Sequence, residues 1–120
     1  MRLLLVRHGE SQGNLEDRFQ GRGEYPLTAR GLRQARCLAE RLKREGVAPA
    51  VIYSSPQECA LRTAGCLTEA LAAPLVTDPR LCERDVGVLT GLTLAEACAR
   101  YPEWGRAWQA ANDEWPPIPG

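Results

Sequence analysis

The stretch MRLLLVRHGESQGN (residues 1–14) opens the chain and weighs most in predicting its fold. Its first six residues form a continuous apolar run, which is typical of a β-strand buried on both faces. The run stops abruptly at Arg7 and His8, which are followed by glycine-rich polar sequence. Because sites in parallel sheets form just beyond the carboxyl ends of strands, this stretch predicts a buried strand that ends in a functional site.

Strand and helix patterns alternate along the rest of the chain. Short apolar runs at residues 50–54 and 74–77 predict two more strands. Apolar residues at helical spacing predict helices that begin at the N-cap Thr28 and at capping boxes in residues 55–58 and 93–96. The alternation predicts an α/β fold with a mainly parallel sheet flanked by helices.

Composition limits the classes of function. The 120 residues correspond to a single domain, and 15 basic against 15 acidic residues argue against nucleic acid or an anionic membrane surface as partner. The longest apolar run near the start, residues 3–6, is too short for a signal peptide or a membrane span, so we expect a cytoplasmic protein. Five cysteines without a C-x-x-C pair, and a single histidine, predict buried free thiols and no metal site.

The residues around His8 have the chemistry of a phosphate site. Arg7 carries a rigid fork of donors that suits phosphate oxygens, and Gly9 lets backbone N–H groups approach an anion. Ser11 and Asn14 add neutral donors. A neutral imidazole among anion donors can attack phosphorus and hold the phosphoryl group covalently.

Residues 7–14 resemble the R-H-G-E-[ST]-x-x-N signature of the histidine phosphatase superfamily, which includes phosphoglycerate mutases and many small phosphatases. Residues 19–35, 54–64 and 81–92 resemble three further segments of that superfamily, in the same order. The resemblance implies a phosphoglycerate mutase-like three-layer α/β sandwich. It also implies that residues 1–120 are a single histidine-phosphatase-like domain, as the N-terminal portion of a longer one.

Carried over by position, the resemblance gives roles to individual residues. His8 is the nucleophile that becomes phosphohistidine, and Glu83 protonates the leaving alcohol. Taken without the resemblance, the sequence favours the interpretation of Glu83 as a loop carboxylate paired with Arg80 or Arg84. The resemblance implies no metal and no cofactor, and a small phosphorylated metabolite as substrate. The residues that it assigns to phosphate or substrate binding are Arg7, Asn14, Gln20 and Gly21, and the donor chemistry described above adds Gly9 and Ser11.

The chain departs from the superfamily pattern at two places. Cys59 stands where the pattern has a second phosphate-binding arginine, and Arg62, one turn further on, either substitutes for it or is a solvated surface residue. The pattern also includes a second histidine, whereas His8 is the only one here. Residues 116–120 resemble a segment that precedes the last helices and strand of the family domain. We therefore expect a C-terminally incomplete fold, with either a missing C-terminal segment or a homo-oligomer.

These patterns predict a phosphomonoester phosphatase that acts through phosphohistidine on His8. Two alternatives stay open at this point. One is phosphotransfer of the phosphoglycerate mutase type. The other is a degenerate, non-catalytic member that binds phosphorylated ligands or a partner protein, which Cys59 and the absent second histidine would favour.

Overall fold

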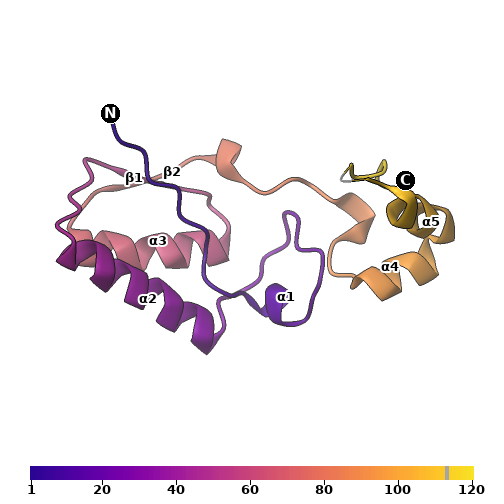
Figure 1. Cartoon of the computed structure of the whole chain (residues 1–120), viewed down its shortest axis with the longest axis horizontal. Coiled ribbons are helices and arrows are strands. Elements are labelled where there is room, and N and C mark those ends of the chain that lie inside the picture. Colours follow the sequence, from indigo (N-terminus) through magenta and orange to yellow (C-terminus); the bar gives the residue numbers. More distant parts are fainter. Residues whose placement is uncertain (113) are drawn as a thin grey trace. The chain divides into compact units, whose positions relative to one another are not determined.

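The computed structural model describes residues 1–112 and 114–120, and it divides the chain into two compact units. Unit 1 comprises Met1–Gln12 and Glu24–Cys82, and unit 2 comprises Gly13–Gly23 and Glu83–Gly120. The elements in chain order are α1 (Gln12–Leu15), α2 (Ala29–Arg44), β1 (Ile52–Ser54), α3 (Glu58–Leu71), β2 (Leu75–Thr77), the 3₁₀ turns η1 (Pro79–Leu81) and η2 (Gly87–Leu89), α4 (Leu94–Arg100) and α5 (Pro102–Ala110) (Figure 1).

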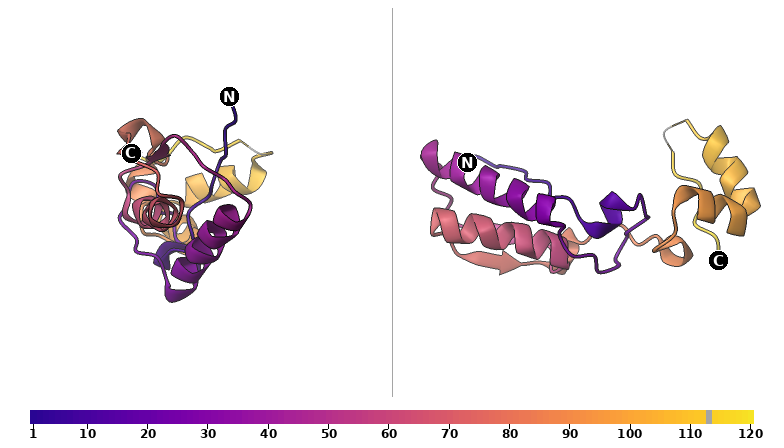
Figure 2. Two further views of the ribbon diagram at one scale, coloured as in Figure 1. Left: turned by 90° about the vertical axis from the view of Figure 1, so that its left-hand side faces the viewer. Right: turned by 90° about the horizontal axis from the view of Figure 1, so that it is seen from below.

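A parallel strand pair and two helices form unit 1. β1 and β2 pair in parallel, with Ile52 opposite Leu75 and Ser54 opposite Thr77. α3 connects the two strands and packs against both of them, and α2 packs along α3 (Figure 2). The predicted α/β class with a parallel sheet and flanking helices is therefore confirmed, with two of the three expected strands.

The first predicted strand is wrong. Residues 1–6 form no strand, and their apolar side chains are exposed, Leu3 by 73% and Leu5 by 89%. A strand needs a hydrogen-bonded neighbour, and among the described residues β1 and β2 pair only with each other. The apolar side chains of residues 3–6 predict burial, but burial of a strand within a sheet requires a partner strand.

The predicted start of α2 is confirmed. The Thr28 hydroxyl accepts a hydrogen bond from the Gly31 N–H at 3.0 Å, which satisfies one of the free donors of the first turn. The helix buries Gly31, Ala35 and Ala39 on one face. It ends before Gly46, which has a φ of 72° that favours glycine.

α3 begins later than the sequence predicts. The expected capping box at residues 55–58 does not form, because the Ser55 hydroxyl accepts from the N–H of Gln57 at 3.1 Å in a local turn. The helix therefore starts at Glu58, with Gln57 as an N-cap that makes no side-chain capping bond. Its buried face carries Cys59, Thr63 and Leu67.

Unit 2 is held together by an aromatic cluster. Val86, Leu89, Ala97 and Trp104 form its buried core. The rings of Phe19 and Trp104 meet edge to face with their centroids 5.9 Å apart, and Trp108 and Trp115 extend the cluster. The capping box predicted at residues 93–96 is present at the start of α4.

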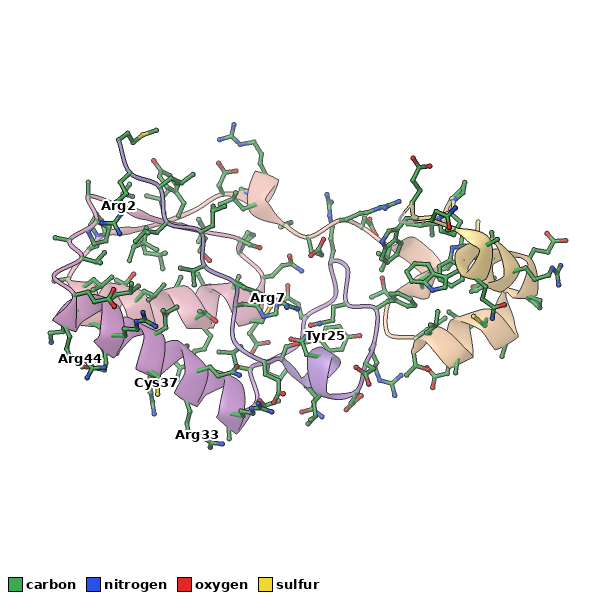
Figure 3. All side chains as sticks on the ribbon, in the orientation of Figure 1. Arg2, Arg7, Tyr25, Arg33, Cys37 and Arg44 are labelled. Carbon is green, nitrogen blue, oxygen red and sulfur yellow. The ribbon has the colours of Figure 1, made fainter. Side chains whose placement is uncertain are left out.

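The cysteines differ from the expectation of buried thiols. Cys59 is buried, but Cys37 is exposed on α2, because that side of the helix faces away from α3 (Figure 3). Across residues 1–112 and 114–120, no helix combines the length and the apolar character needed to cross a bilayer.

Candidate active site

Two glycines allow the backbone next to His8 to pack closely against α2. A Cβ at Gly9 would overlap the carbonyl oxygen of Gly31, and a Cβ at Gly31 would overlap that of Glu10. The first turn of α2 therefore lies against the backbone of residues 9 and 10 without any intervening side chain. The Glu10 N–H also donates to the side-chain oxygen of Gln34 at 2.9 Å, which ties the same segment to the next turn of α2.

A side chain of α3 holds the other side of this segment. The buried Gly9 N–H donates to the Thr63 hydroxyl at 3.1 Å, and that hydroxyl donates to the Cys59 carbonyl at 2.8 Å. Gly9 therefore lies between the first turn of α2 and the first turns of α3. Contacts from both helices therefore fix the backbone next to His8, from which the His8 side chain projects.

The His8 ring has a defined hydrogen-bonding pattern. Its Nδ1 lies 2.7 Å from the carbonyl oxygen of Gly9. A carbonyl oxygen only accepts, so Nδ1 carries the proton, and in the neutral ring Nε2 carries the lone pair. This is the tautomer in which Nε2 can act as a nucleophile.

His8 lines a cavity of about 230 Å³ in unit 1. Arg7 and Gly9 line the same cavity, so the structure brings these three predicted residues together. Arg7 projects near the end of α3 at which that helix begins (Figure 3). The remaining lining residues come from α2 and α3 and are Gln34, Ala35, Leu38 and Thr63.

The surroundings of the ring raise the pKa of His8 above its usual 6.5. The largest cause is a hydrogen bond with the side chain of Cys59, and the Gly9 carbonyl adds to it. Partial burial and the positive charge of Arg7 act in the opposite direction. The net effect favours the protonated ring.

Two further predicted residues of unit 1 do not line this cavity. Ser11 is fully buried and forms an isolated antiparallel bridge with Leu27. Arg62 is exposed on α3, between the buried Cys59 and Thr63. Its exposure is the property expected of a solvated surface residue.

Four predicted residues belong to unit 2. Asn14 lines a separate cavity of about 290 Å³ together with Phe19 and Trp108. Gln20 packs on Gly13, where a Cβ would come within 2.5 Å of the Gln20 Cγ. Gly21 has a φ of 48°. A side-chain oxygen of Glu83 accepts from the Arg84 N–H at 2.7 Å, which is a local contact within its loop.

Two contacts that hold the segment around His8 were not predicted from the sequence: the Thr63 hydroxyl with the Gly9 N–H, and the Gln34 side chain with the Glu10 N–H. Thr63 and Cys59 stand four residues apart and therefore share a helix face, which is a signal that the sequence does contain. Their partner, residues 8–9, is more than fifty positions away, and no local pattern specifies that contact. No group of three or more histidine, cysteine or acidic side chains placed to hold a metal ion occurs in the described part of the chain.

A family model described as "histidine phosphatase superfamily (branch 1)" matches residues 3–120. The chain belongs to this superfamily, and the resemblance seen in the four sequence segments is thereby confirmed.

Individual relatives span both phosphatases and mutases. The chain is 40% identical, over 96% of its length, to a 2,3-bisphosphoglycerate-dependent phosphoglycerate mutase of Sphingopyxis alaskensis, of which it covers 52%. A solved mycobacterial glucosyl-3-phosphoglycerate phosphatase is 33% identical, with a TM-score of 0.76 over 91% of this chain and 51% of that one. YhfR of Bacillus stearothermophilus is 35% identical, with a TM-score of 0.80 over 92% of this chain and 54% of that one. The chain thus spans about half the length of the relatives it matches.

Proposed function

We propose that this chain carries the nucleophilic part of a phosphomonoester hydrolase that works through a phosphohistidine on His8. The observation that carries the proposal is the hydrogen bonding of the His8 ring and its place in the cavity. Its Nδ1 is committed to the Gly9 carbonyl, so the neutral ring has its lone pair on Nε2, and it lines a cavity beside the Arg7 guanidinium. Membership of a superfamily whose relatives include phosphatases and a mutase supports this proposal.

In the first half-reaction, the Nε2 lone pair of His8 forms a bond to phosphorus, and the bond between phosphorus and the ester oxygen breaks. The departing alkoxide takes a proton, for which we propose Glu83 as donor, and leaves as an alcohol. The Arg7 guanidinium stabilises the transferring phosphoryl oxygens by its charge and by its fork of N–H donors. Proton donation of this kind contributes about 10²–10⁴-fold to a rate.

In the second half-reaction, water attacks the phosphorus of the phosphohistidine, and the nitrogen–phosphorus bond breaks. The electron pair returns to Nε2, and the proton released by the water passes to the Glu83 carboxylate. Inorganic phosphate leaves, and both residues regain their starting charge. No outside oxidant or reductant is needed, because only a phosphoryl group and protons move.

Phosphotransfer of the mutase type is the second candidate, and the similarity to a phosphoglycerate mutase favours it. The two activities share the first half-reaction and differ in what accepts the phosphoryl group from His8. Water gives hydrolysis, and a hydroxyl of a phosphorylated acid gives transfer. The two activities are distinguished by measuring how much of the phosphoryl group is transferred to added 3-phosphoglycerate and how much to water.

The test begins with the full chain and p-nitrophenyl phosphate. We expect release of p-nitrophenolate, together with an acid-labile phosphate adduct on the protein. The His8→Asn variant is expected to lose both signals. Cys37→Ser is the matched control, because Cys37 is exposed on α2 and does not line the cavity, so it should behave as the wild type.

Retention of turnover in His8→Asn would overturn the proposal. Absence of both adduct and turnover in the wild-type chain would overturn it as well. In that case, retained binding of inorganic phosphate would identify the chain as the non-catalytic, phosphate-binding member, in which Cys59 replaces a cationic phosphate ligand.

A further inference from the structure

The peptide between Gly9 and Glu10 uses both of its polar groups. Its carbonyl, which belongs to Gly9, lies 2.7 Å from Nδ1 of the His8 ring. Its N–H, which belongs to Glu10, donates to the side-chain oxygen Oε1 of Gln34 at 2.9 Å. Gln34 lies on α2, so a single peptide connects the His8 ring to a side chain of that helix.

The planarity of this peptide couples the two hydrogen bonds. The peptide is trans, and in a planar trans peptide the C=O and the N–H point in opposite directions. A rotation that moves the Glu10 N–H away from Gln34 therefore turns the Gly9 carbonyl by the same angle. By holding the N–H, Gln34 fixes the direction in which the carbonyl meets the ring.

Other groups hold the two neighbouring peptides. In the preceding peptide, the Gly9 N–H donates to the Thr63 hydroxyl at 3.1 Å. In the following peptide, the Glu10 carbonyl accepts from the Thr28 N–H at 2.9 Å. Neither bond holds a polar group of the peptide between them, and Gly9 has no Cβ that restricts its rotation. The direction of the Gly9 carbonyl therefore depends on Gln34.

The Gly9 carbonyl in turn decides which nitrogen of the neutral ring carries the proton. A neutral imidazole has two tautomers, and the hydrogen bond made by one nitrogen selects between them. Because a carbonyl oxygen only accepts, it keeps the proton on Nδ1 and leaves the lone pair on Nε2. A carbonyl that turns away from the ring leaves both tautomers populated.

We propose that Gln34 is a positioning residue, which acts through the Gly9–Glu10 peptide to hold the neutral His8 ring in the tautomer with its lone pair on Nε2. The inference rests on the proposed function only for the use made of that lone pair, because the tautomer is a property of the resting chain. Gln34 is exposed, so water can replace it as an acceptor. A water molecule is not attached to α2, however, and does not fix the direction of the peptide.

The experiment measures the ring ¹⁵N shifts of the full chain by NMR without a substrate. His8 is the only histidine, so every imidazole signal belongs to it. Spectra are recorded well above the titration midpoint of each variant, where the ring is neutral. In the wild type we expect the shift of a protonated nitrogen at Nδ1 and that of an unprotonated nitrogen at Nε2.

Three variants test the dependence on Gln34. Gln34→Met has a side chain of similar length whose sulfur is only a weak acceptor, so both ring nitrogens should move toward the average of the two tautomers. Gln34→Glu retains an acceptor oxygen and should keep the wild-type pattern. Cys37→Met is the matched control, because Cys37 is exposed on α2 and does not line the cavity, and it should match the wild type.

A Gln34→Met variant with a native amide spectrum and unchanged ring shifts would overturn the inference, as would averaged tautomers in Gln34→Glu. If Gln34→Met does not fold, the wild-type chain decides. Its Glu10 amide should exchange slowly with solvent, as a hydrogen-bonded amide does. A protonated Nε2 or a rapidly exchanging Glu10 amide in the wild type would refute the arrangement.

Failure of this inference is distinguishable from failure of the proposed function. The ring shifts are measured without a substrate, so an unchanged tautomer in Gln34→Met leaves the phosphohistidine proposal standing. A wild-type chain that forms no phosphate adduct overturns that proposal and leaves the ring shifts as they are.

Discussion

Substitution of Gly31 by alanine tests the backbone contact that places His8. Gly31 lies in the first turn of α2, and a Cβ there would overlap the Glu10 carbonyl oxygen and stand 2.8 Å from the Glu10 nitrogen. Gly65 is the matched control, because it lies inside α3 and a Cβ there meets nothing within 4 Å. Both changes place alanine in a helix, so the difference between them comes from the atoms that surround the added methyl group.

The magnitudes follow from those surroundings. Alanine is favoured over glycine in a helix by about 1 kcal/mol. Gly65→Ala should therefore stabilise the protein by about 0.4–1 kcal/mol. Gly31→Ala gains a similar amount, but forcing a methyl into packed backbone costs about 1–3 kcal/mol. The displaced Glu10 carbonyl would also lose its 2.9 Å bond from the Thr28 N–H, worth about 1 kcal/mol.

Gly31→Ala should thus be destabilised by about 1–3 kcal/mol, and the two variants should differ by about 2–4 kcal/mol. Urea unfolding followed by far-UV circular dichroism measures this difference directly. A Gly31→Ala variant as stable as Gly65→Ala would refute the close packing of α2 on residues 9 and 10. The imidazole signals of His8 should also move in Gly31→Ala and stay in place in Gly65→Ala.

Four further outcomes follow from single contacts. Thr63→Val leaves the buried Gly9 N–H without its partner and should cost about 1–3 kcal/mol in urea unfolding, whereas Thr63→Ser should cost less. Thr93→Ala removes the capping box of α4 and should cost about 1 kcal/mol, read from tryptophan fluorescence. Ala72→Gly should stabilise the chain by about 1 kcal/mol in urea unfolding followed by far-UV circular dichroism, because Ala72 has a φ of 51°. Because the pKa of His8 is raised in the folded chain, protonation of His8 should stabilise the fold below pH 6.5, and this contribution should disappear as the pH rises through the folded pKa. Urea unfolding midpoints measured across that pH range should fall with rising pH in the wild type, and this fall should be absent in His8→Gln.

Local chemistry explains the elements that the sequence predicted correctly. Thr28 and the Thr93–Glu96 pair begin helices through bonds to N–H groups three residues away. The superfamily signature likewise lies within residues 7–14, and it was readable without any knowledge of packing. The start of α3 was misplaced because Ser55 can bond locally in two ways, as a helix cap or as a turn.

The sequence by itself determined the α/β class, the helix starts at Thr28 and Thr93, and the nucleophile candidate His8, because each depends on residue types within a few positions of one another. Only the tertiary structure decided that residues 1–6 are left without a strand partner and that His8 lines a cavity together with residues of α2 and α3. The bridge from Gly9 to Thr63 joins residues 54 positions apart, and such a contact exists only once two helices have packed around one segment of backbone.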